Sequence, residues 1–468
     1  MRQPKDFDRL KPIHIAGTKG KGSTSAFVSS ILAQYIPSST GSPTPPTKTG
    51  LYTSPHLRFV RERIQINNEP ISEEQFAKYF FEIWDLLEAG ARVAETPSDA
   101  PTKPVYFRYL TLMALHAYLK EGVDSAVIEC GIGGEYDSTN ILSKPTVTAV
   151  TSLGIDHTAM LGSTLPEIAW HKAGIFKEGG VAFTAPQKEE AIAVLQQRAA
   201  EKGTALHVID VHPSLANDEV KLGLSAAFQK INASVAIAVA AAHLRALGHT
   251  SIPDPATTPH IPLPPQFVQG LEQVRLAGRC EIRREKNVAW HIDGGHTLES
   301  IEVTGRWFAD QMVSLKGTRQ STPQAPRIMI FNQQTRDANA LAKALYTVLQ
   351  TGITSGATSP FTHVIFTTNQ THSEGYKPDL VSINTNQQDV DTLAVQRALA
   401  QTWSEIDDNA HVQVLKTIEE AIAVARSIAG KWAETAGADP EVMVLITGSL
   451  HLVGGAVEVL ETEATELV

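Results

Sequence analysis

Short apolar runs alternate with helical segments along the first half of the chain. Residues 12–16 (PIHIA) predict a buried strand, and residues 23–35 place Phe27, Ile31 and Tyr35 on one face at helical spacing. Further buried strands are predicted over residues 125–129, 146–151 and 181–184.

The second half of the chain shows the same alternation more clearly. Helical patterns cover residues 338–349 and 418–433. Strands separated by helices form parallel sheets that are covered on both faces, so the pattern predicts two α/β domains. The strands predicted in this half cover residues 288–293, 327–332, 362–368, 412–416 and 442–447.

Proline-rich segments mark the breaks in this pattern. Residues 37–47 and 95–104 are predicted to be surface loops. Residues 253–265 contain six prolines and are typical of a stiff spacer near a domain boundary. We place a first domain over residues 1–275, which includes these three segments, and a second over residues 276–468.

Composition and charge exclude several classes of protein. With 42% hydrophobic and 19% charged residues the chain is globular, and its net charge of −10 disfavours nucleic-acid or anionic-membrane binding. The most apolar stretch, residues 235–242, is too short to span a membrane. Two cysteines, Cys130 and Cys280, form no disulfide framework, and the N-terminus lacks a leader pattern. We therefore expect a cytoplasmic protein.

A glycine-rich loop, GTKGKGST, follows the first strand and opens the next helix at residues 17–24. Glycines allow backbone N–H groups to surround a phosphate, and the helix N-terminus adds positive potential. Lys21 would offset phosphate charge, and Ser23 or Thr24 could offer a hydroxyl near a metal ion. Gly22 interrupts the strict phosphate-loop pattern, and a flexible turn remains the alternative.

Four other side chains occur in motifs with both a chemical and an ordinary explanation. Glu129 ends a strand, where an acid suits Mg²⁺, although it could simply close that strand. Ser54 in TSPHL could belong to a turn, and His157 in SLGIDH to a capped helix start. Lys172 lies in a helical pattern, where a lysine normally faces solvent.

Three candidates belong to the second domain. Arg279 lies in LAGRCE, and Asp293 and His296 lie in DGGHT, which follows the first strand of that domain. They could form part of a ligand site, and a structural salt bridge of Arg279 or Asp293 is equally compatible with the pattern.

Taken together and in order, the motifs resemble those of the folylpolyglutamate synthase family, within the ATP-dependent Mur ligase superfamily. The resemblance is greatest to the eukaryotic form and runs from about Phe7 to the C-terminus. It implies a P-loop ATPase domain with a parallel-rich sheet, followed by a smaller Rossmann-like C-terminal domain. The motifs that carry it are HIAGTKGKGST, TSPHL, VRERIQIN, GIGGEYDSTN, SLGIDHTAMLG, IAWHKAGIFK, DGGHT and TGSLHLVGGA.

By this resemblance each candidate receives a role. Gly20, Lys21, Gly22 and Ser23 would hold ATP phosphates, with Arg279 and Asp293 as further ATP contacts and His296 near the phosphates. Ser54, Glu129 and His157 match Mg²⁺ ligands, and Lys172 matches a lysine that is carbamylated in relatives and then binds a second ion; a monovalent cation is a further candidate. The proposed catalytic residues are Lys21, Lys172 and His296.

The implied reaction belongs to one-carbon metabolism. A monomeric enzyme would use ATP to add L-glutamate to the γ-carboxylate of tetrahydrofolate or folylpolyglutamate, through an acyl phosphate. Dihydrofolate synthesis by the same machinery, nucleotide binding without ligase activity, and a switch-type NTPase are the alternatives.

Three departures from the family pattern bear on these expectations. Leu276 and Ala277 replace the usual Trp-Pro, and Gly295 replaces an alanine, which is expected to loosen the loop. The phosphate loop begins at Gly17, after a shorter leading segment than in relatives. We therefore expect a truncated gene model or weakened folate binding, and a mitochondrial location if an upstream presequence exists.

Overall fold

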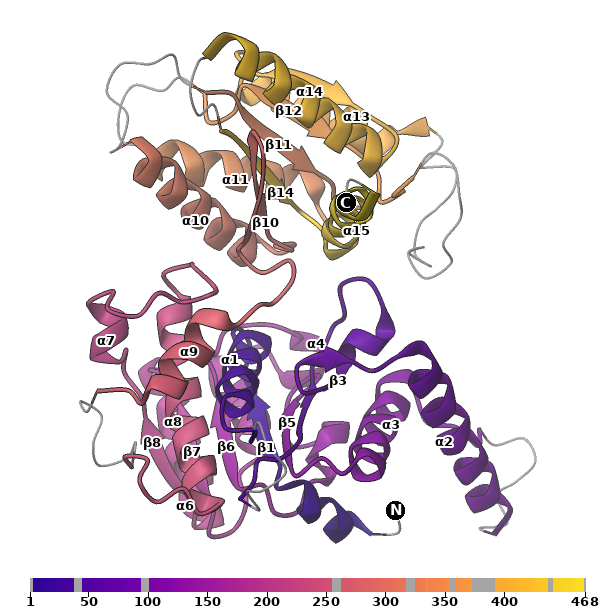
Figure 1. Ribbon diagram of the computed structural model, residues 1–468, viewed down its shortest axis with the longest axis vertical. Coiled ribbons are helices and arrows are strands. Elements are labelled where there is room, and N and C mark those ends of the chain that lie inside the picture. Colours follow the sequence, from indigo (N-terminus) through magenta and orange to yellow (C-terminus); the bar gives the residue numbers. More distant parts are fainter. Residues whose placement is uncertain are drawn as a thin grey trace. The chain divides into compact units, whose positions relative to one another are not determined.

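Residue contacts in the computed structural model divide the chain into two compact units. Unit 1 contains residues 1–56 and 60–275, and unit 2 contains residues 57–59 and 276–468 (Figure 1). The structure describes residues 3–37, 44–93, 101–254, 262–316, 325–334, 336–352, 359–372, 392–436 and 441–466. Parts of the expected loops 37–47 and 95–104, and of the spacer 253–265, lie outside these ranges.

An eight-stranded sheet with the order β4-β3-β2-β5-β1-β6-β7-β8 forms the centre of unit 1. Six of these strands are parallel, while β3 and β4 extend one edge in antiparallel pairs. The strands are β1 (Ile13–Ala16), β2 (Thr49–Tyr52), β3 (Ile64–Ile66), β4 (Glu69–Pro70), β5 (Ser125–Glu129), β6 (Val147–Val150), β7 (Val181–Thr184) and β8 (Ala205–Val208).

Helices cover both faces of this sheet. Ala126 and Ile128 of β5 share a buried cluster with residues of α3, whereas Ser125 accepts or donates a hydrogen bond at 3.1 Å to His243 of α8. Because successive strand residues point to opposite faces, α3 and α8 lie on opposite sides. The helices of unit 1 are η1 (Pro4–Leu10), α1 (Lys21–Ala33), η2 (Val60–Arg63), α2 (Glu73–Val93), α3 (Tyr106–Glu121), η3 (Ser138–Ile141), α4 (Thr158–Leu161), α5 (Leu165–Ala173), α6 (Glu189–Lys202), α7 (Pro213–Ala216), α8 (Gln229–Ala246) and α9 (Pro265–Gln273).

Helix α9 follows the proline-rich spacer and still belongs to unit 1, where it lies alongside α1 (Figure 1). Ser30 of α1 donates a hydrogen bond to the Gly270 carbonyl at 2.7 Å. A Cβ atom on Gly270 would lie 2.6 Å from the Ile31 Cα, so glycine allows this close approach. The spacer is therefore not the point at which the chain leaves unit 1.

Unit 2 contains a six-stranded sheet with the order β13-β12-β11-β14-β10-β9, in which β9 alone is antiparallel to its neighbour. Its strands are β9 (Glu281–Glu285), β10 (Val288–Ile292), β11 (Arg327–Phe331), β12 (His363–Phe366), β13 (His411–Val414) and β14 (Val442–Thr447). Its helices are α10 (Leu298–Lys316), α11 (Ala338–Gly352), α13 (Ala394–Ile406), α14 (Ile418–Ala436) and α15 (Leu450–Glu466).

Both units confirm the α/β fold class, with parallel-rich sheets between helices. The strands predicted after residue 276 occur at the expected positions, within one or two residues at their ends. None of the helices in the described ranges has the combined length and apolar character needed to cross a lipid bilayer.

The Gly270 contact predicts a difference between two helical glycines. We expect Gly270→Ala to lower the free energy of unfolding by about 1–3 kcal/mol, because its methyl group overlaps the α1 backbone. The urea midpoint should fall accordingly. Gly430→Ala in α14 has no atom within 4 Å of the new Cβ and is expected to gain up to about 1 kcal/mol from helix propensity. Equal midpoints for the two variants would contradict this account of α9 packing.

Candidate functional site

The phosphate loop connects β1 to α1 and is held by the segment that follows β6. The backbone N–H groups of Thr18 and Lys19 donate to the Ser152 carbonyl at 3.0 and 3.1 Å, and Thr151 Oγ1 donates to the Lys19 carbonyl at 2.7 Å. Gly20 begins α1 with φ 87°, a left-handed conformation that favours glycine. The loop thus has the strand–turn–helix context required of a phosphate site.

Helix α8 supports this loop through two buried amide side chains. Gln229 donates to Ser23 Oγ at 3.1 Å, and Asn232 donates to Gln229 Oε1 at 2.9 Å. A Cβ atom on Gly20 would lie 2.2 Å from Asn232 Oδ1, which gives a second reason for glycine there. Sequence reasoning missed Gln229 and Asn232, because polar residues in the first turn of a helix are ordinary and carry no local signal of burial.

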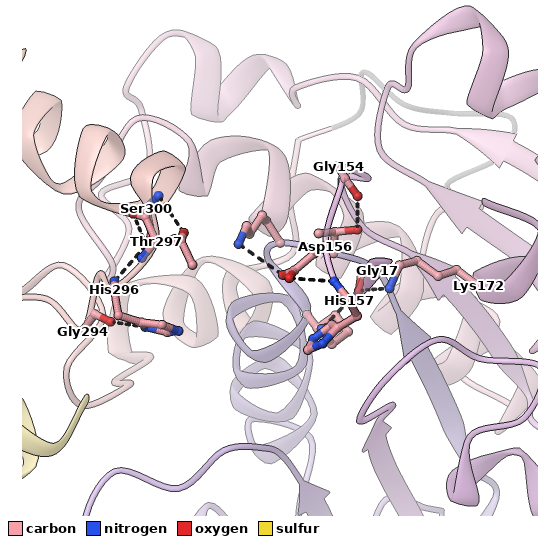
Figure 2. A network of polar contacts seen from close by, with 12 residues as sticks. Gly17, Gly154, Asp156, His157, Lys172, Gly294, His296, Thr297 and Ser300 are labelled. Atoms are coloured by element: carbon pink, nitrogen blue, oxygen red, sulfur yellow. Dashed lines mark hydrogen bonds and ion pairs between the residues drawn. The ribbon is translucent and has the colours of Figure 1, made fainter. Parts of the chain in front are cut away.

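Lys21 and Lys172 meet at one backbone atom, the carbonyl oxygen of Gly17. Their Nζ atoms donate to it at 3.1 and 2.7 Å, respectively (Figure 2 draws the Lys172 bond). Lys172 is 3% exposed, so it does not face solvent as a helical lysine ordinarily does. Burial and then the neighbouring Lys21 charge lower the pKa of Lys172 to about 7. A substantial neutral fraction is therefore present near neutral pH.

Ser54 and Glu129 lie together at the carboxyl ends of the adjacent strands β2 and β5, with Glu129 as the last residue of β5. The Ser54 N–H donates to Glu129 Oε2 at 3.0 Å, and Glu129 is 3% exposed. A Cβ atom on Gly22 would lie 3.6 Å from Glu129 Oε2, so the carboxylate faces the first turn of α1. A carboxylate beside a phosphate loop fits Mg²⁺, which binds through one or two carboxylates together with substrate phosphates.

His157 follows β6, next to the phosphate loop in Figure 2. Its backbone is left-handed, with φ 51°, and its N–H donates to Asp156 Oδ1 at 2.9 Å. His157 occupies the position before α4, but its side chain makes no capping bond there. Burial is the main cause of its lowered pKa, which favours the neutral imidazole that a metal ligand requires.

The expected metal residues do not form a cluster rich in acids and histidines. In the ranges that the structure describes, no group of three or more His, Cys, Asp or Glu side chains is arranged to hold a metal ion. The expected set contains only Glu129 and His157 of these types. A metal ion there would need additional ligands, such as the Ser54 hydroxyl and substrate phosphates.

Arg279, Asp293 and His296 lie near the carboxyl end of β10 within unit 2. A Cβ atom on Gly294 would lie 3.1 Å from Arg279 Nη1, so the guanidinium packs against that glycine. His296 Nδ1 lies 2.8 Å from the Gly294 carbonyl oxygen, which can only accept, so Nδ1 carries a proton and donates this hydrogen bond (Figure 2). Asp293 is 8% exposed and bonds to backbone and hydroxyl donors of the same unit.

Curated relatives resemble the chain over almost its whole length. The folylpolyglutamate synthase of Neurospora crassa is 47% identical over 459 residues, which cover 97% of this chain and 82% of that protein. The folylpolyglutamate synthase of Saccharomyces cerevisiae is 45% identical over 467 residues, covering 97% of this chain and 78% of that protein. No family model matches the chain.

Solved structures share the fold at lower identity. Mycobacterium tuberculosis folylpolyglutamate synthase, complexed with ADP and AMPPCP, has a TM-score of 0.66 at 22% identity, covering 97% of this chain and 94% of that chain. A Yersinia pestis bifunctional folylpolyglutamate synthase/dihydrofolate synthase, complexed with AMPPNP and a Mn ion, has a TM-score of 0.63 at 21% identity. The match covers 98% of this chain and 91% of that chain. The chain therefore shares the two-domain Mur ligase fold of these proteins.

The buried lysine predicts a specific pH dependence of stability. Because the Lys172 pKa is about 7 when folded and 10.5 ordinarily, the unfolded chain binds more protons between these values. The contribution of Lys172 to the free energy of unfolding is therefore lowest below pH 7. It rises between about pH 7 and pH 10.5, by up to about 1.4 kcal/mol per pH unit. In CO₂-free buffer, Lys172→Met should remove this rise; parallel urea-midpoint profiles for both proteins would contradict it.

Proposed function

Because the chain belongs to the folylpolyglutamate synthase family, we propose that it is an ATP-dependent ligase that adds L-glutamate to the γ-carboxylate of tetrahydrofolate or folylpolyglutamate. The observation that carries the proposal is 47% identity across 97% of the chain. The phosphate loop with its two converging lysines supports it independently.

The phosphate loop supplies the binding needed for the first step. Backbone N–H groups of Gly20, Gly22 and Ser23 at the start of α1 would hold the ATP phosphates, and the Lys21 ammonium would offset their charge. A γ-carboxylate oxygen of the folate attacks the γ-phosphorus, and the bond to ADP breaks. The glutamate α-amine then attacks the acyl phosphate carbon and expels phosphate, which leaves an amide and a released proton.

Ser54, Glu129 and His157 would hold a Mg²⁺ ion in this proposal, and a monovalent cation is a further candidate. When bound, Mg²⁺ neutralises charge on the transferring phosphoryl group. The Ser54–Glu129 bond keeps the carboxylate oriented towards the first turn of α1, which supports the assignment. In unit 2, Arg279 and Asp293 would contribute to ATP binding, and His296 would lie near the phosphates.

Lys172 would act as a carbamate rather than as an ammonium. A neutral amine adds to the carbon of CO₂ and releases one proton, so the reaction requires the unprotonated form. The lowered pKa of about 7 provides that form at neutral pH. The product replaces a cation beside Lys21 with an anionic group, which could bind a second metal ion.

We also propose a monomer that works in the cytoplasm, with a mitochondrial form where a presequence is present. The net charge of −10 supports small-molecule substrates over nucleic acid. Sedimentation and cell fractionation would test these two points.

The ligase proposal predicts products that are heavier by successive glutamyl units. Tetrahydrofolate incubated with ATP, Mg²⁺ and glutamate should yield them by mass spectrometry, and Lys21→Ala should slow glutamate-dependent ADP release by at least about 10²-fold. Lys120→Ala, an exposed lysine of α3, is the control. If the protein extends dihydropteroate but not tetrahydrofolate, it is a dihydrofolate synthase. ATP hydrolysis that needs neither folate nor glutamate would indicate a switch-type NTPase. ATP binding without turnover would indicate a nucleotide-binding protein that lacks ligase activity.

The carbamate predicts a labelled adduct. With carbon-13 bicarbonate above pH 7, wild-type protein should show a carbamate resonance that disappears in Lys172→Met and decreases as pH falls below about 7, since protonation of the amine blocks the reaction. An unchanged resonance in Lys172→Met would assign the adduct elsewhere. Absence of any resonance in wild-type protein would reject carbamylation.

A further inference from the structure

Thr304, on α10 of unit 2, is a fully buried hydroxyl to which the family resemblance gives no role. Its Oγ1 lies 2.6 Å from Asp293 Oδ1 and 2.9 Å from the Ser300 carbonyl oxygen. A hydroxyl has a single proton to donate, and a carboxylate is the stronger acceptor. The proton is therefore directed mainly to Asp293.

Asp293 in turn joins two segments that carry candidate site residues. Its Oδ1 also accepts from the Gly295 N–H at 2.9 Å, and its Oδ2 accepts from the Cys280 N–H at 2.9 Å. Cys280 has a left-handed φ of 47° and follows Arg279 directly, while Gly295 precedes His296. The carboxylate thus fixes both the Arg279 turn and the His296 loop.

Gly295 provides the space for this arrangement. A Cβ atom there would lie 2.7 Å from Thr304 Oγ1 and 3.2 Å from Asp293 Oδ1. The methyl group of an alanine would therefore overlap the Thr304 hydroxyl and disturb its hydrogen bond to Asp293. Both backbone groups of Gly295 are bonded, because its N–H donates to Asp293 Oδ1 and its carbonyl accepts from Gly448 N at 3.1 Å. Gly295 and Thr304 are therefore sterically matched.

We propose that Thr304 is a positioning residue for the ATP-dependent reaction. Its hydroxyl orients the Asp293 carboxylate, and the carboxylate holds the segments that carry Arg279 and His296. Gly295 is required because Thr304 occupies the space that an alanine methyl group would take. The catalytic consequence rests on the proposed function, whereas the hydrogen-bonded arrangement itself does not.

The first experiment removes only the hydroxyl. In Thr304→Val we expect faster backbone hydrogen exchange, by mass spectrometry, in peptides covering residues 276–282 and 293–297, and a KM for ATP about 10-fold higher, as for loss of one bond to a charged group. Thr304→Ser should restore both. Thr347→Val on α11 is the matched control, because Thr347 makes the same bond to the carbonyl four residues earlier but is exposed.

The outcomes separate this proposal from the proposed function. If the wild-type protein extends no folate, the proposed function fails, and hydrogen exchange still decides whether Thr304 fixes the two segments. Exchange in Thr304→Val equal to wild type would overturn the proposal. A KM for ATP unchanged in an active Thr304→Val enzyme, or Thr304→Ser behaving like Thr304→Val, would also overturn it.

A double-mutant cycle tests the steric match and does not depend on the behaviour of valine. Gly295→Ala alone should raise the KM for ATP about as much as Thr304→Ala, since either change disrupts the same bond. In the Thr304→Ala background, where Oγ1 is absent, Gly295→Ala should add less than about a two-fold further change. Additive effects of the two substitutions would overturn the match.

Discussion

The carbonyl oxygen of Gly17, where the phosphate loop begins, accepts hydrogen bonds from the side chains of two lysines, Lys21 and Lys172. Two ammonium groups at one acceptor repel each other, so they cannot both keep a proton without loss of stability. Burial decides which one yields: Lys172 is 3% exposed, and its pKa falls to about 7. The lowered pKa gives Lys172 the neutral amine on which the proposed carbamylation depends.

The parts of the fold that the sequence predicted are those whose signal is local. β1, β5, β6 and the parallel strands of unit 2 are short runs rich in apolar and β-branched residues between helical segments, which is the pattern expected of a parallel sheet covered by helices. The phosphate loop was equally accessible, because glycines between a strand and a helix indicate one geometry. The Ser54–Glu129 contact agrees with the rule that ligand sites lie beyond the carboxyl ends of parallel strands.

The remaining features depend on partners far away in the chain. Gln229 reaches Ser23 across 206 residues, and only the packing of α8 against α1 brings the two together. Leu57–Phe59 belong to unit 2, where Leu57 packs on the core and Arg58 pairs with Glu458 and Glu461 of α15, contacts that no local pattern indicates. Lys172 has the sequence environment of an exposed lysine, and tertiary packing alone buries it.

Acids that end a buried parallel strand serve a common purpose in both units. A carboxylate removed from water must be compensated by donors, and loop backbone N–H groups are the nearest ones available. Glu129, the last residue of β5, accepts from Ser54 N, and Asp293, directly after β10, accepts from Cys280 N and Gly295 N. The charge therefore orders the loops that carry the polar side chains. An acid at this position therefore organises loop backbone in addition to any ligand that it contacts.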